Sequence, residues 1–252
     1  MLGRTHALTG LCAGLALAPL LVDTLAQTLV IAAVTAGYAL LPDLDHPGAR
    51  ASKLLGPVTG VLSRAVRAAS SWLYLRTKGP RDERHRGEHR HATHTLAFAL
   101  LAGTATALGT WGGGPWVPVG IAAVGTLLAV DALGDWVLPI VGISAAAWWG
   151  TIPGDPLTEL AGIGPVLGIA VAAGCLTHCL GDALTLSGCP FLWPLPIAGE
   201  TWYEIRPPRP LRFRTGGAVE KRLVFPAFVV ASVLLLPGAT PLLLGLAGIG
   251  SG

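Results

Sequence analysis

The sequence predicts an all-α protein: a polytopic transmembrane helix bundle of about seven spans, with interfacial segments on the cytoplasmic side. Three observations lead to this prediction. Of the 252 residues, 52% are hydrophobic and only 12% are charged, whereas an ordinary soluble domain carries about 25% charged residues. The mean hydropathy is +0.62, and the apolar residues form runs that approach the roughly 20 residues of a membrane-crossing helix. The basic residues, finally, are confined to a few of the segments between these runs.

The apolar runs define the expected spans, which are 7–22, 25–42, 93–111, 116–135, 136–150, 162–183 and 223–245. Several are shorter than a full bilayer crossing. We expect the first run to be a helix of the protein and not a signal peptide, because a second apolar run follows at once, as in a helical hairpin. No linker divides the chain, so residues 1–252 are expected to form a single integral membrane domain.

The basic residues predict the orientation. All 17 lysines and arginines lie at Arg4, between the second and third spans (43–92), or between the sixth and seventh (184–222). Because basic residues favour the cytoplasmic side, these two segments and the N-terminus are expected in the cytoplasm. Seven spans place both basic segments on the same side of the membrane as the N-terminus, whereas six would place one of them on the opposite side. The net charge of +3 is too small to indicate nucleic-acid binding.

The cytoplasmic segments differ in character. Residues 53–75 have the apolar spacing of an amphipathic helix, which would lie in the membrane interface or pack on the bundle. Residues 76–90 are too charged to be buried and indicate a loop. Residues 184–222 are rich in proline, which predicts extended and turning chain. The four cysteines lie in or beside apolar segments and are expected to be reduced core residues.

A strip of imidazoles at residues 84–96 is the first sign of a functional site. Four of the seven histidines lie within ten residues here, at the mouth of an expected span. Ionisable side chains are costly at such a place and are usually functional. With the predicted topology, every histidine falls at or near the cytoplasmic face. These are His6, His46, His85, His89, His91, His94 and His178.

Acidic residues near the same face strengthen the case for a metal site. Asp43 and Asp45 follow the second span closely, and a divalent cation would relieve their mutual repulsion; a solvated helix end is the alternative. His178 and Asp182 are four residues apart and share a helix face, either as ligands or as a pair that orders helix packing.

Further charged residues allow two interpretations. Asp131 and Asp135 are also four residues apart, and could supply ligands, a general base or part of an ion path. Arg84, Arg86 and Arg90 could bind a phosphate or serve only to orient the protein. A helix beginning near residue 92 would place its N-terminus beside them, which favours a bound anion.

Several of these motifs recur in a known family. The relevant segments, in order, are Thr5-His6, Leu41-Pro42-Asp43-Leu44-Asp45-His46, His89-Arg90-His91-Ala92-Thr93-His94-Thr95-Leu96, and His178 with Asp182, Thr185, Gly188 and Pro190. Together they resemble the YdjM-like proteins of the bacterial inner membrane, which are described as metal-dependent hydrolases, some of them regulated by LexA. The family's central motif reads H-R-G-x-T-H-S-L, and this chain has His91 and Thr95 at the Gly and Ser positions. The resemblance covers most of the chain and implies a reaction class while leaving the substrate open.

We therefore expect a metal-dependent hydrolase of the bacterial inner membrane, with its site facing the cytoplasm and a lipid or lipid-linked substrate such as a phosphoester. Histidine and carboxylate ligands suit Zn²⁺, with Mn²⁺ or Fe²⁺ as alternatives. The expected ligands are His6, Asp43, Asp45, His94, His178 and Asp182. The expected catalytic residues are His89, Arg90, Asp131 and Asp135. The alternatives are a proton or metal-ion transporter that uses the intramembrane acids, and a non-catalytic membrane scaffold with a structural metal.

Overall fold

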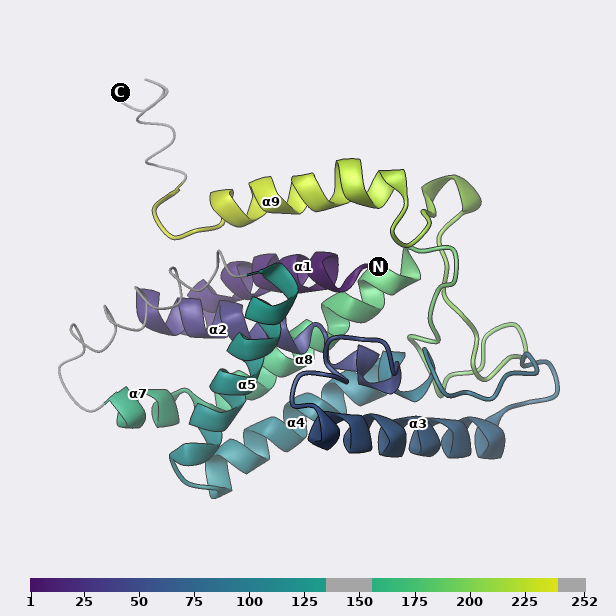
Figure 1. Cartoon of the computed structure of the whole chain (residues 1–252), viewed down its shortest axis with the longest axis horizontal. Helices are drawn as coiled ribbons and strands as arrows, with labels where there is room; N and C mark the ends of the chain where they lie inside the picture. Colours follow the sequence, from purple (N-terminus) through teal and green to yellow (C-terminus); the bar gives the residue numbers. More distant parts are fainter. Residues whose placement is uncertain (135–155, 240–252) are drawn as a thin grey trace.

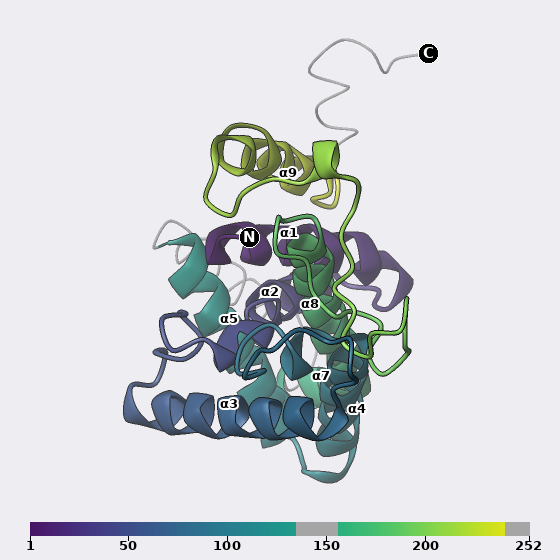
Figure 2. The ribbon, with the colours of Figure 1, turned by 90° about the vertical axis from the view of Figure 1, so that its right-hand side faces the viewer.

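The computed structural model describes residues 1–134 and 156–239, and in these ranges the chain is α-helical without a β-sheet (Figures 1 and 2). The all-α prediction is therefore confirmed. The predicted span 136–150 and Asp135 lie outside the described residues. The α-helices are α1 (Gly3–Leu17), α2 (Leu25–Tyr38), α3 (Pro57–Thr77), α4 (Leu96–Gly112), α5 (Trp116–Leu133), α7 (Pro156–Gly162), α8 (Gly164–Ala183) and α9 (Phe225–Leu234).

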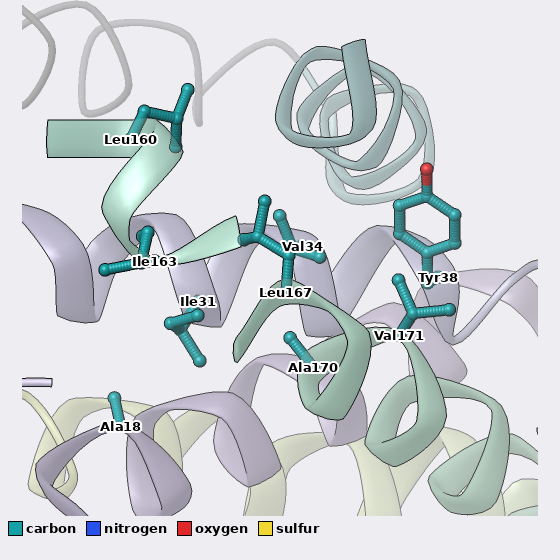
Figure 3. Close-up of a cluster of buried hydrophobic side chains, with 9 residues drawn as sticks. All are labelled: Ala18, Ile31, Val34, Tyr38, Leu160, Ile163, Leu167, Ala170 and Val171. Carbon is teal, nitrogen blue, oxygen red and sulfur yellow. The ribbon is translucent and has the colours of Figure 1, made fainter. Parts of the chain in front are cut away.

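The centre of the bundle is α2. It packs against α1, α5 and α8, and α4 lies along the other side of α8. Figure 3 shows the apolar contact between α2 and α8, where Ile31 and Val34 approach Leu167 and Val171. All four of these side chains are buried. The four cysteines are also buried and unpaired, as predicted.

Three described segments are long and apolar enough to cross a membrane: Leu25–Asp45, Trp116–Leu133 and Gly164–Ala183. They correspond to the predicted spans 25–42, 116–135 and 162–183. Helix α4 is a shorter apolar helix at the predicted span 93–111. Helices α1 and α9 occupy only part of the predicted spans 7–22 and 223–245, with 15 and 10 residues. Seven is thus an approximate count.

Glycines allow the central helices to approach closely. A Cβ on Gly37 of α2 would lie 1.8 Å from the carbonyl oxygen of Gly125 in α5. Between α4 and α8, a Cβ on Gly168 would lie 2.5 Å from the carbonyl oxygen of Gly103. Small residues at helix crossings are typical of membrane bundles, where backbone contact replaces the hydrophobic effect between helices.

We expect the substitution Gly37→Ala to destabilise the bundle by about 3 kcal/mol or more, because the added methyl group can be accommodated only if α2 and α5 separate. Gly120→Ala on α5 is the matched control, since a Cβ at Gly120 meets no atom within 4 Å. Thermal unfolding in detergent measures both variants. Equal midpoints for the two variants would contradict the close α2–α5 packing.

Helix α3 confirms the amphipathic helix predicted for residues 53–75, although it begins at Pro57 and ends at Thr77. Its buried face is polar and consists of Thr59, Ser63, Ser70 and Tyr74. Its exposed face is largely apolar, with Val58, Val61, Leu62, Trp72 and Leu75. Figures 1 and 2 both show α3 along the lower edge of the bundle. A helix that turns its apolar side outward and contains arginines but no acidic residue suits the surface of a membrane.

The remaining segments are irregular, as predicted. Residues 78–91 contain no α-helix, and residues 184–217 have only turns, isolated β-bridges and the 3₁₀ helix η4 (Arg209–Leu211). In Figure 1 both segments lie at the right, at the end of the molecule that carries the N-terminus. Residues 220–224 form a π-helix that continues into α9.

Candidate metal centre

A cluster of histidines and aspartates lies where four chain segments converge. These are the start of α1, the 3₁₀ helices η2 (Pro42–Asp45) and η3 (Ala92–His94), and the last turn of α8. All six predicted ligands lie at this place: His6, Asp43, Asp45, His94, His178 and Asp182. Five of them are fully or almost fully buried, and Asp43 has 22% of its side chain exposed.

The local sequence explains how each segment positions its side chains at the cluster. Pro42 is compatible with the first turn of a helix and begins η2, which ends at Asp45. The Thr95 hydroxyl accepts a hydrogen bond from the Phe98 amide and caps α4, so His94 lies just before that helix and not in its first turn. On α8, His178 and Asp182 lie one turn apart on one face, as their spacing predicts.

Two imidazole nitrogens face each other at the centre of the cluster. His178 Nδ1 donates to the Ala39 carbonyl oxygen at 2.7 Å, which leaves a lone pair on Nε2 of the neutral ring. The Thr93 hydroxyl donates to Asp45 Oδ2, so it accepts from His94 Nδ1 at 3.0 Å. In the neutral ring, His94 Nε2 then also carries a lone pair, and the two Nε2 atoms are 3.1 Å apart.

Carboxylates complete this group. Asp43 Oδ1 lies 3.7 Å from His94 Nε2 and 3.6 Å from His178 Nε2. Asp182 Oδ2 lies 3.5 Å and 3.7 Å from the same two nitrogens. Ligands of a tetrahedral Zn²⁺ are about 2.0–2.2 Å from the metal and therefore roughly 3.3–3.6 Å from one another. Each carboxylate thus lies at close to ligand spacing from the two nitrogens.

The other contacts of Asp182 come from His6, Arg90 and the chain terminus. Its Oδ1 atom lies 3.2 Å from His6 Nε2 and also contacts the Met1 amine. Its Oδ2 atom lies 3.0 Å from Arg90 Nη2, yet the angles do not make this contact a hydrogen bond. Neither nitrogen of His6 forms a hydrogen bond, and its ring stacks on His178 with centroids 3.8 Å apart. Buried polar atoms without hydrogen bonds are rare, and an ion is one explanation for them.

Asp45 holds the loop that follows α3 onto the cluster. Its Oδ2 atom accepts hydrogen bonds from the Thr93 hydroxyl at 2.7 Å and the Arg90 amide at 3.1 Å. Its Oδ1 atom pairs with His89 Nδ1 at 2.6 Å. Arg90 has the left-handed φ of 59°, an uncommon conformation for a residue with a side chain. Asp45 therefore ties the 89–94 loop to the cluster.

Three groups in the described chain have the spacing of metal ligands. They are His6 with His178 and Asp182; Asp43 with His94 and His178; and Asp43 with Asp45 and His89. Asp43 and His178 each belong to two groups, so one or two ions fit the donor set. No thiol belongs to any group. Nitrogen and carboxylate donors of this kind suit Zn²⁺, Mn²⁺ or Fe²⁺.

The structure places the remaining candidates elsewhere. His85 pairs with Glu83 on the surface, and Asp131 forms a half-exposed ion pair with Arg50. The ring of His91 packs edge-on against Tyr74 with centroids 4.5 Å apart, and burial lowers the pKa of His91. Of the predicted catalytic residues, His89 and Arg90 thus adjoin the cluster, whereas Asp131 belongs to no ligand group among the described residues.

Two supporting contacts were not predicted from the sequence. The first is the Ala39 carbonyl, which orients His178. The second is Glu220, whose carboxylate accepts from the amides of Leu2 and Gly216 at 2.6 and 2.7 Å. Burial alone would raise the pKa of Glu220, but these hydrogen bonds hold it below its ordinary value. Glu220 thereby fixes the start of α1, on which His6 lies. An acidic residue beside a predicted span was the signal available in the sequence for this role.

A family model described as YdjM inner membrane protein matches residues 1–241. No curated protein and no solved structure matches the chain.

Proposed function

The chain belongs to the YdjM inner membrane protein family, and we propose that it is a metal-dependent hydrolase that acts on a lipid-linked phosphoester at the cytoplasmic surface of the membrane. The observation that carries the proposal is the pair of inward-facing Nε2 atoms on His94 and His178, 3.1 Å apart beside two aspartates. Hydrogen bonds that fix the other ring nitrogen are typical of metal-ligating histidines.

The metal would be held by Asp43, His94, His178 and Asp182, with His6 adjoining Asp182. A bound divalent ion lowers the pKa of a coordinated water and polarises the scissile bond. Catalytic sites of this kind leave a position open to substrate. The opening here lies at Asp43, His89 and Arg90, which have side chains 22%, 33% and 20% exposed.

His89 is suited to move a proton. Its Nδ1 atom pairs with buried Asp45, and His89 lines a surface cavity. A carboxylate behind an imidazole fixes its tautomer and stabilises its charged form. His89 would take a proton from the attacking water and return it to the oxygen that leaves when the phosphoester bond breaks.

Arg90 is suited to bind the phosphoester. Its guanidinium lies 3.0 Å from Asp182, and the residue lines the same cavity as His89. A planar guanidinium pairs with two phosphate oxygens at once. It would therefore hold the substrate's anionic oxygens at the centre and neutralise charge that develops during hydrolysis.

Helix α3 supports a lipid-linked substrate. Its exposed face carries Trp72 and Leu75, whereas on its buried face the Ser70 hydroxyl donates to the Gly87 carbonyl at 2.6 Å and accepts from the Ala92 amide at 3.2 Å. One helix thus connects a membrane-compatible surface with the loop that carries His89 and Arg90. The basic residues around this loop favour the cytoplasmic side.

An ion path across the membrane has less support. In the described helices α2, α4, α5 and α8, the acidic, basic and histidine residues are Asp131, His178 and Asp182. Each lies in the C-terminal part of its helix, and the rest of these helices is without such groups. A proton or ion relay needs polar groups through the whole bilayer.

The test is hydrolysis by the purified protein in nanodiscs that contain lipid phosphoesters with phosphate, glycerol or ethanolamine headgroups. We expect product release that EDTA abolishes and Zn²⁺ or Mn²⁺ restores. Arg90→Ala should raise KM for the lipid by roughly tenfold or more, because a charge-assisted contact to phosphate is lost. Metal-loaded protein that releases no product from any of these lipids would contradict the proposal.

A further inference from the structure

A second cavity adjoins the one that His89 and Arg90 line, and lies between the end of α3 and residues 200–212. Its volume is about 280 Å³, near the lower limit of about 300 Å³ for small-molecule sites. It shares His85, His91 and Glu204 with the cavity that His89 and Arg90 line. A ligand group in this cavity could therefore belong to the same molecule as a phosphoester at the metal centre.

Aromatic side chains form a fixed wall of the cavity. Trp202 donates from its amide to Asp82 at 2.9 Å and from its indole nitrogen to Thr77 at 3.0 Å. The Tyr74 hydroxyl donates to the Glu83 carbonyl, and the Tyr74 and Trp202 rings lie 5.4 Å apart. Both side chains are almost fully buried: Trp193 stacks on Trp202 with ring centroids 4.8 Å apart, and Lys78 Nζ lies 5.8 Å from the centroid of the Tyr74 ring. These contacts hold the wall in place before any ligand binds.

Unused hydrogen-bond acceptors line the same cavity. His91 is only 8% exposed, and its Nδ1 atom donates to the His89 carbonyl at 2.7 Å, so Nε2 of the neutral ring is an acceptor. Neither this atom nor the Glu200 carboxylate has a hydrogen bond or ion pair in the part of the chain that the structure describes. The neighbouring Glu83 and Glu204 are already paired with His85 and Arg206.

We propose that this cavity binds the ammonium group of an amine-bearing headgroup, and so selects the substrate of the hydrolase proposed above, on which the proposal rests. The Glu200 carboxylate, which lines the cavity, supplies the opposite charge that an ammonium group requires. The N–H groups of the ammonium would donate to Glu200 and to His91 Nε2. The phosphoester of the same molecule would reach Arg90 through the shared lining.

Binding is tested on the full-length protein in detergent after EDTA treatment, so that no turnover is needed. Calorimetric titration with phosphoethanolamine should show saturable binding, and glycerol phosphate should bind much more weakly. Glu200→Gln should weaken phosphoethanolamine binding roughly tenfold, because a charged hydrogen-bond partner is lost. Glu159→Gln is the control, since Glu159 lies on α7 and bonds Gln27. Absence of saturable phosphoethanolamine binding, equal binding of both probes, or an unaffected Glu200→Gln variant would overturn the proposal.

Turnover separates this proposal from the one it rests on. If metal-dependent hydrolysis occurs at equal kcat/KM for ethanolamine and glycerol headgroups, the hydrolase assignment stands and the ammonium pocket is wrong. If phosphoethanolamine binds in a Glu200-dependent way but no lipid is hydrolysed, the pocket stands and the hydrolase assignment fails. A preference for ethanolamine lipids that Glu200→Gln removes supports both.

Discussion

Replacing His94 by alanine is expected to empty the proposed metal centre. His94 Nε2 lies within 3.1–3.7 Å of donor atoms on His178, Asp43 and Asp182, so its loss removes the group that joins the two carboxylates. Metal affinity should fall at least about 100-fold, because removing even an outer partner of a ligand costs 10- to 100-fold. Elemental analysis of the purified protein should show the metal content falling from a stoichiometric amount to below about a tenth of that amount.

His85→Ala is the matched control for that experiment. His85 lies on the same histidine-rich strip, but its ring is exposed and pairs with Glu83. Its removal should leave the metal content unchanged. Because His94 is fully buried, thermal unfolding in the presence of EDTA shows whether His94→Ala remains folded, and His94→Gln provides a variant of closer volume. Stoichiometric metal in both His94 variants would contradict the assignment.

Replacing Asp45 by alanine is expected to have the largest effect on stability. Asp45 is fully buried and accepts from the Thr93 hydroxyl and the Arg90 amide, and it pairs with His89. Removal of one partner from a buried charged network typically costs about 3–5 kcal/mol. The thermal midpoint should therefore drop strongly, and metal affinity should fall with it because the Thr93 hydroxyl no longer orients His94.

Asp131→Ala is the control for this second experiment. Both aspartates lie next to the end of a predicted span, but Asp131 is half exposed in an ion pair with Arg50. Exposed pairs contribute about 0–1 kcal/mol, so its loss should hardly change the midpoint. Asp45→Asn, which keeps one acceptor oxygen, should be intermediate. An Asp45→Ala variant as stable as Asp131→Ala would show that the 89–94 loop does not depend on Asp45.

The sequence alone determined the membrane class, the helical fold and the set of candidate ligands. Apolar runs and amphipathic spacing are local properties, so they predicted α2, α5 and α8 as spans and α3 as an amphipathic helix. The proline-rich segment was predicted to be irregular for the same reason, since proline acts on its own neighbourhood. The order of His and Asp motifs also predicted the family, which the match over residues 1–241 confirms.

Only the tertiary structure decided which residues each candidate contacts. Asp43 and Asp45 are equivalent by spacing, yet η2 turns Asp43 toward His94 and His178 and Asp45 toward His89 and the Arg90 amide. His91 adjoins the ligands in sequence but packs on Tyr74. These outcomes depend on contacts between residues far apart in the chain, such as His178 with Ala39. The direction of a side chain at such a junction is set by helix packing, which local sequence patterns do not encode.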